Sequence, residues 1–208
     1  HSVLTARTLT LGNPTPSAEW GDAVPSHGTL QVQAQQIVLG AGMFQTQGYD
    51  TVAMTGSTAI IGRDQGGLQV SGGDLSLITS RLSAQHQAHT VISADGAVDI
   101  ALPAAPVTAL PSAGLGARLD ISGRKVRHAG IIDLPSGTVN LTAWGSTAQD
   151  GVRLSDGAMI RVAGVAKIFG TGTAMVPGGN VGLHSARGDI ELEAGTLVEL
   201  SAATGGTA

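Results

Sequence analysis

The chain has 208 residues, of which 42% are apolar, only 2% are aromatic, 12% are charged and none is cysteine, and its formal net charge is −4. The apolar fraction is too high for a disordered chain, no disulfide can stabilise the fold, and no apolar run reaches the ~20 residues of a membrane helix. The apolar residues are mainly Ala, Val, Leu and Ile, which suit a narrow and repetitive core.

Residues 1–66 alternate irregularly between short apolar pairs and polar segments. Short strands are expected at 9–11, 30–32, 38–39 and 60–61. Residues 12–28 contain three prolines and predict a protruding loop, and residues 40–50 separate two strands in the same way. Insertions of this kind loop outward and leave the strands around them in place.

Residues 67–208 are more regular, because apolar and polar residues alternate in many short stretches. Each stretch predicts a strand with one face toward the core, and Gly or Asp-Gly usually precedes it. A proline-bearing excursion, 102–116, interrupts one repeat. The alternating pairs are Leu68/Val70, Leu75/Leu77, Val98/Ile100, Leu119/Ile121, Val139/Leu141, Ile160/Val162, Val181/Leu183, Ile190/Leu192 and Val198/Leu200.

The starts of these strands recur at a regular interval. GAVDIAL, GTVNLTA and GNVGLHS begin at residues 96, 137 and 179, and GARLDISG, GAMIRVAG and GTLVELSA begin between or after them at 116, 157 and 195. The first inward residues of the merged series follow one another in steps of 21, 20, 21, 21 and 17. They are Val98, Leu119, Val139, Ile160, Val181 and Val198.

A period near 20 residues, made only of strands and turns, is typical of a β-solenoid. We therefore predict an all-β fold, a parallel β-helix of about ten coils of about 20 residues, with the inward residues stacked on adjacent coils. A leucine-rich repeat would need a leucine frame that is missing, and a β-sandwich would not give this spacing. A coil without a covering neighbour is expected to associate end to end, unless a loop such as 12–28 covers it.

Four glycine-bounded stretches, 72–100, 130–146, 150–164 and 178–195, resemble the passenger regions of filamentous-haemagglutinin-like exoproteins, which are secreted by the two-partner route. The resemblance covers roughly residues 28–208. It implies a long right-handed parallel β-helix that passes through an outer-membrane transporter. It also implies a secreted or cell-surface location and adhesion to host cells, other bacteria or matrix, as in virulence.

The Asn-Pro-Asn-Gly-type motif of that family's secretion domain is missing, and GNPTPS at 12–17 does not replace it. We therefore expect one β-helix segment of a larger adhesin, part of its shaft, without enzymatic activity. The receptor is not predicted. No cofactor is expected.

The alternative is a carbohydrate-active enzyme or a sugar-binding module on the same fold. Such an enzyme needs carboxylates that converge on one face. Asp99 and Asp120 hold comparable outward positions 21 residues apart, and Glu191 and Glu193 flank the inward Leu192. We interpret all four as solvated outward residues, so no catalytic residue is predicted.

Two further classes of ligand are not favoured. GRKVRHAG, residues 123–130, is the nearest approach to a basic patch and is interpreted as a solvated strand or corner. Nucleic-acid binding needs a clustered basic face, often with stacking aromatics, so no nucleic-acid partner is expected. His86 and His89 are close in sequence, but a metal site needs a third ligand, and none is predicted.

Trp144 follows an expected strand at a coil corner, where it is a candidate sugar contact or the cover of a loop. Arg187-Gly188-Asp189 spells a tripeptide that some adhesive proteins present to integrins, and it is the candidate cell-attachment motif. It falls in the turn between NVGLHS and DIELE, where glycine supplies conformational freedom. The turn is too short to project, so we expect an accessible motif that contributes little to adhesion.

Overall fold

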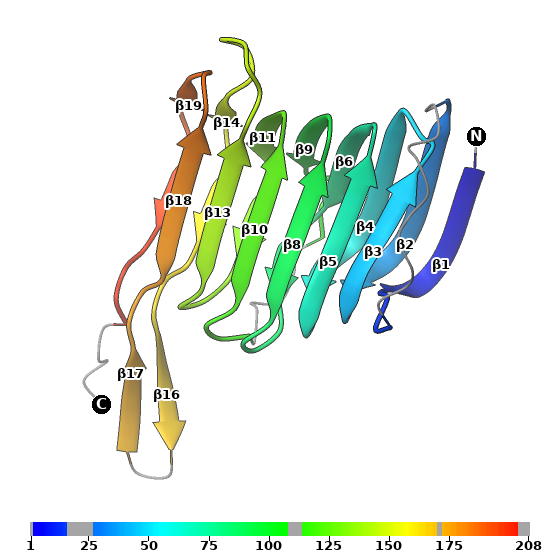
Figure 1. Cartoon of the computed structure of the whole chain (residues 1–208). Coiled ribbons are helices and arrows are strands. Elements are labelled where there is room, and N and C mark those ends of the chain that lie inside the picture. Colours follow the sequence, from blue (N-terminus) through cyan, green and yellow to red (C-terminus); the bar gives the residue numbers. More distant parts are fainter. Residues whose placement is uncertain (1, 16–26, 108–113, 170–171, 204–208) are drawn as a thin grey trace.

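The computed structural model describes residues 2–15, 27–107, 114–169 and 172–203, and these ranges contain strands but no helix. Parallel strands stack as a β-solenoid of about six turns (Figure 1). The fold class predicted from the alternation is therefore confirmed. Residues 16–26 and 108–113, the central parts of the expected excursions 12–28 and 102–116, lie outside the described residues.

Three faces enclose the core, and each is a ladder of parallel strands. Face 1 contains the N-terminal halves of β1 (Ser2–Leu11), β2 (Thr29–Leu39) and β4 (Thr51–Gly62), then β6 (Asp74–Thr79), β9 (Ala97–Ala101), β11 (Lys125–Ala129), β14 (Val152–Leu154) and β19 (Ile190–Leu192). Face 2 contains the C-terminal halves of β1, β2 and β4, then β7 (Leu82–Ala84), β12 (Ile131–Asp133), β15 (Met159–Arg161) and β20 (Leu197–Glu199). Face 3 contains β3 (Gly42–Gln47), β5 (Gln65–Ser71), β8 (His89–Ala94), β10 (Arg118–Gly123), β13 (Thr138–Ala143) and β18 (Asn180–Ser185).

Two insertions leave the solenoid without interrupting its ladders. After β9, the chain departs at residue 102, and β12 pairs directly with β7 on face 2. After β15, β16 (Val165–Phe169) and β17 (Gly172–Val176) form an antiparallel hairpin that extends away from the stacked strands (Figure 1). Both insertions lengthen a coil while the strands on either side keep their partners.

The coil is about 24 residues long rather than 20, and the turns number about six rather than ten. Val52, Leu75 and Val98, which occupy one register position on successive strands of face 1, are 23 residues apart. The predicted length was wrong because the merged series moved between faces. Its members lie on face 1 (Val98), on face 3 (Leu119, Val139 and Val181) and on face 2 (Ile160 and Val198).

The inward direction of those six residues was nevertheless predicted correctly. Four of them are fully buried, and Val181 and Val198 pack against the core with partial exposure. Among their companions, Ile100, Ile121, Leu141 and Val162 are buried and Leu183 is partly buried. Leu200 is 47% exposed, so its predicted place in the core is wrong: no further described coil covers it.

The core consists of continuous columns of stacked side chains. On face 1 one column comprises Leu4, Val32, Met54, Leu77, Ile100, His128, Leu154 and Leu192. On face 2 another comprises Leu9, Ile37, Ile60, Leu82, Ile132, Ile160 and Val198. The interior members are at most 2% exposed, and burying one such aliphatic side chain contributes about 1.5–3 kcal/mol.

His128 interrupts the aliphatic column of face 1. The stretch 123–130 was expected to be solvated, and Lys125 and Arg127 are indeed exposed. That expectation is wrong for His128, which alternation turns inward and which is 0% exposed. Its Nε2 lies 3.1 Å from the carbonyl oxygen of Met159 and donates to it, while Nδ1 has no hydrogen-bond partner. Burial lowers the pKa of His128 to about 4, so the ring is neutral near pH 7.

Val139→Asp should abolish the cooperative unfolding of the solenoid near β13. The side chain at this position is 0% exposed, and an unpaired buried charge costs several kcal/mol even after relaxation. Thr142→Asp is the matched control, because Thr142 lies on the same strand and points outward. Circular dichroism melts would contradict the assigned core if the two variants unfolded at the same temperature.

The stability of the protein should fall as the pH decreases from about 6.5 to about 4, partly through His128. The folded pKa of this ring is lower than its unfolded value, so the unfolded chain binds the extra proton and gains from acid. The shift corresponds to about 3 kcal/mol. Urea unfolding at several pH values should show a smaller loss for His128→Leu than for the wild type, whereas His184→Gln, at an exposed position, should behave as the wild type. Equal losses in His128→Leu and the wild type would contradict this role.

Candidate functional site

Arg187, Gly188 and Asp189 lie between β18 and β19, at the corner where face 3 leads into face 1. The side chains of Arg187 and Asp189 are exposed. The main chain is held closely: the carbonyl oxygen of Asp189 accepts a hydrogen bond of 3.1 Å from the amide of Val152. A Cβ atom at Gly188 would lie 2.6 Å from main-chain atoms of Asp150. The corner therefore stacks directly on the preceding coil and does not project as a loop.

Beside this corner, an open groove of about 480 Å³ lies on the outer surface of face 1. Its floor is one register position on four successive strands, where outward charged side chains stack: Asp99, Arg127, Arg153 and Glu191. Lys125 and Asp189 flank this row, and Ala148 and Gln149 border it from the long corner between β13 and β14. The groove thus joins the tripeptide to a surface of mixed charge.

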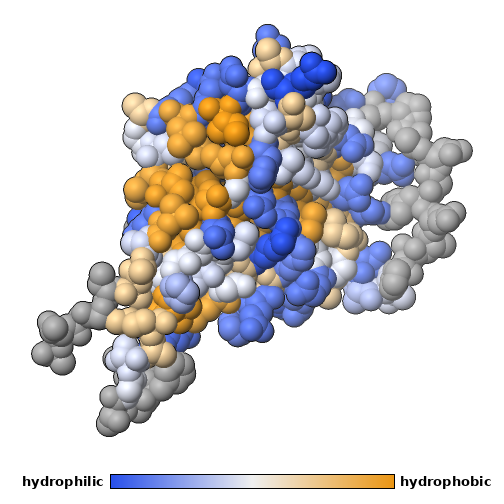
Figure 2. Space-filling view, turned by 60° about the vertical axis from the view of Figure 1, so that its left-hand side comes forward, coloured by the Kyte–Doolittle hydropathy of each residue, from blue (hydrophilic) through white to orange (hydrophobic). Residues whose placement is uncertain are grey.

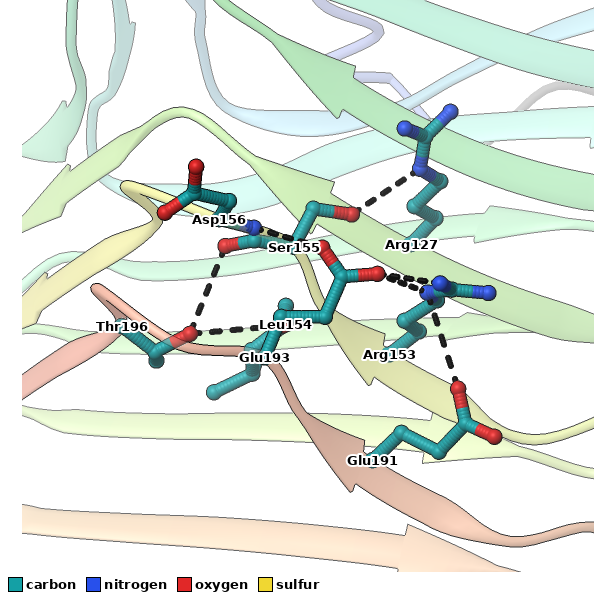
Figure 3. A network of polar contacts seen from close by, with 8 residues as sticks. All are labelled: Arg127, Arg153, Leu154, Ser155, Asp156, Glu191, Glu193 and Thr196. Atoms are coloured by element: carbon teal, nitrogen blue, oxygen red, sulfur yellow. Dashed lines mark hydrogen bonds and ion pairs between the residues drawn. The ribbon is translucent and has the colours of Figure 1, made fainter.

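Glu193 and Arg153 form the centre of the polar network next to the groove (Figure 3). Arg153 Nε donates to Glu193 Oε1 at 2.6 Å, and Asp156 N donates to Glu193 Oε2 at 2.7 Å. The bond from Asp156 and then the guanidinium of Arg153 hold the pKa of Glu193 below its usual value. Glu191 Oε2 lies 3.6 Å from Arg153 Nε. Both glutamates point outward as predicted, but they share an arginine and are not simply solvated.

Arg127 is held by a neighbouring hydroxyl. Its Nε donates to Ser155 Oγ at 3.0 Å (Figure 3). The row of the groove therefore contains two adjacent arginines with fixed partners. Ionised carboxylates held by guanidinium groups bind polar ligands but are poor proton donors near neutral pH, so this arrangement suits binding better than acid catalysis.

The predicted pair Asp99 and Asp120 is not brought together. Asp99 lies on β9 of face 1, whereas Asp120 lies on β10 of face 3. Three side chains bind Asp120 at 2.7 Å: His89 through Nε2, Arg118 through Nε and Asn140 through Nδ2. Burial raises the pKa of Asp120, but the hydrogen bonds from Arg118, Asn140 and His89 outweigh it and lower the pKa.

The two neighbouring histidines also have separate roles. His86 Nδ1 lies 3.0 Å from the carbonyl oxygen of Leu115, while His89 contacts Asp120. Within the described ranges, no group of three or more His, Asp or Glu side chains is placed to hold a metal ion.

Trp144 follows β13 directly, and its side chain is 48% exposed. It is not among the residues that line the groove. The corner that it opens is closed by Asp150, a buried residue that the sequence analysis missed. Asp150 accepts hydrogen bonds from Thr147 Oγ1 (2.7 Å), Thr147 N (3.1 Å) and Arg124 Nη1 (2.6 Å), and the Thr147 hydroxyl, followed by these other donors, lowers its pKa. A threonine three residues before an aspartate in a polar corner was the available signal.

A second groove, of about 510 Å³, lies on face 2 between residues 106–107 and the start of β16. Arg81 lines it, with Nε and Nη1 buried and without a hydrogen-bond partner. Burial lowers the pKa of Arg81, and the nearby Asp133 opposes that change. Because these two nitrogens are closed off from solvent, a ligand in the groove does not reach them.

Comparison of the chain with family models, with curated proteins and with solved structures finds no match. The described ranges also hold no helix with the length and apolar character needed to cross a bilayer. The candidate site is therefore assessed from its own geometry: a tight, exposed tripeptide beside a groove of mixed charge.

Asp189→Glu should leave the attachment of cells to the immobilised chain within about twofold of the wild type. The turn is stacked on Asp150 and Gly151, so it does not offer the projecting carboxylate that integrin-type recognition uses. The measurement is the number of attached cells per area, with circular dichroism to verify folding. A loss of attachment of tenfold or more, with the fold intact, would identify this corner as the receptor site.

Proposed function

We propose that the chain is a structural shaft unit of a secreted bacterial surface adhesin, of the filamentous-haemagglutinin-like kind, which mediates attachment to cells or matrix. The observation that carries this proposal is the continuous stacking of face 1 from β1 to β19 and of face 2 from β1 to β20. Each inner strand of these ladders binds the coils before and after it through main-chain hydrogen bonds. Bending such a stack would stretch many bonds at once, so the coils form a stiff rod.

The outer surface supports a presentational role. Outward carboxylates such as Asp120, Glu193 and Glu199 each lie against an arginine. Such pairs stabilise neighbouring coils modestly and leave loops and corners as the variable parts of the surface. The hairpin β16–β17 and the excursion after β9 are suitable places for contacts with a receptor.

The proposed route of secretion agrees with how such a fold assembles. A solenoid coil contacts chiefly its neighbouring coils, so a chain that emerges from an outer-membrane transporter can fold coil by coil. The absence of cysteine means that this folding needs no disulfide formation. The outer-membrane transporter is therefore the proposed partner during secretion, and the cell surface or medium is the proposed location.

The attachment of coated beads to cultured cells and to matrix tests the function. Beads that carry the folded chain should attach at least several-fold better than beads that carry the core variant Val139→Asp. Thr142→Asp, which changes the same strand outside the core, should retain attachment. Equal attachment by the folded chain and by the core variant would contradict an adhesive role.

A sugar-binding module is the second candidate, and the groove on face 1 favours it. Carboxylates and guanidinium groups placed side by side, as in Asp99, Arg127 and Arg153, can exchange several hydrogen bonds with sugar hydroxyls. A glycan array with the wild type and with Arg153→Ala examines this candidate. Release of reducing ends from a polysaccharide would instead indicate an enzyme and overturn the shaft proposal.

A further inference from the structure

The C-terminal end of the solenoid exposes its core. Four large apolar side chains of the last coil are between 42% and 55% exposed: Ile190, Leu192, Leu197 and Leu200. Figure 2 shows a broad hydrophobic area on this side of the molecule. The strands β18, β19 and β20 are the last in their ladders, so their outer edges carry unpaired main-chain groups among the described residues. An edge that is both apolar and unpaired is a template for another strand.

The N-terminal end presents the complementary edge. Among the described residues β1 pairs only with β2, so its other edge is open. Leu4 is 44% exposed, although it begins the same column that Leu192 ends. Leu9 begins the column of face 2 that Val198 ends. Each apolar column is therefore open at both ends of the chain.

The two edges also agree in register. The inward residues of β1, Leu4 and Leu9, are five residues apart, whereas Leu192 and Val198 are six apart. The solenoid already contains such a pairing. In β2, Val32 and Ile37 are five residues apart, and they pair with Met54 and Ile60 of β4, which are six apart, through a register shift after Ala34.

Charge favours the same arrangement. The last coil carries four carboxylates, on Asp189, Glu191, Glu193 and Glu199, against one arginine, Arg187. The only charged residue of β1 is Arg7, which is exposed and lies in the corner between Leu4 and Leu9. Glu193 and Thr196 occupy the equivalent corner between Leu192 and Val198. Two C-terminal ends placed against each other would instead oppose carboxylates, so like-end contact is disfavoured.

We propose that a second copy of this chain docks head to tail on the C-terminal coil. Its β1 adds to β19 and β20 as a parallel strand and continues faces 1 and 2. Leu4 of the second copy then covers Leu192, and Leu9 of the second copy covers Val198. A head-to-tail contact leaves one free end of each kind, so the assembly grows as an open filament. This inference depends only on the two ends and not on the adhesin proposal.

Sedimentation velocity over a concentration series tests the proposal. The weight-average mass of the wild type should rise steadily with concentration. Leu192→Asp and Leu4→Asp should each remain monomeric alone, because each blocks one end at an exposed position. An equimolar mixture of the two variants should form a dimer and no larger species, since one open end of each kind remains. Val107→Asp, at a 49% exposed position away from both ends, is the matched control and should associate as the wild type does.

Three results would overturn the head-to-tail contact. These are a strictly monomeric wild type, self-association by Leu4→Asp, or a mixture of the two end variants that stays monomeric while the wild type associates. Circular dichroism on each variant verifies the fold. Failure here would leave the bead-attachment result unaffected, and failure of attachment would leave this assembly test unaffected.

Discussion

The main-chain ladder between successive coils is the interaction on which the rest of the structure depends. Parallel strands hold their partners in register, so an inward side chain on one coil lies directly above the corresponding side chain of the next. The core is therefore a set of columns, such as the one from Leu4 to Leu192. Narrow columns of this kind are filled by Leu, Ile and Val, which explains why 2% of the chain is aromatic.

The same register stacks the outward side chains, and this decides the character of the candidate site. On face 1 it places Arg127 beside Arg153, two like charges at adjacent positions, an arrangement that is unfavourable unless partners compensate. Ser155 and Glu193 supply those partners. The groove of mixed charge thus follows from compensating a stacked row, and its binding capacity is a consequence of the architecture.

The ladders also explain how the fold tolerates insertions. The chain leaves face 2 after β9, and β12 pairs with β7 in its place, so no strand of that face lacks a neighbour there. The hairpin β16–β17 satisfies its own main-chain groups through antiparallel pairing. Only the terminal coils cannot be satisfied internally. Surface variation is therefore inexpensive along the rod, whereas its ends remain reactive.

The sequence by itself determined the strands, their inward residues and the solenoid class, because alternation and glycine-bounded turns are local features. It also located the exposed corner at Arg187 and Asp189. Only the tertiary structure decided which strands are neighbours, since pairing joins residues 20 or 42 apart according to the insertions between them, as for Val139 with Leu119 and Val181. For the same reason the coil length, the separation of Asp99 from Asp120 and the burial of His128 and Asp150 could not be predicted. Each depends on what the adjacent coil places beside the residue, and a local pattern does not contain that information.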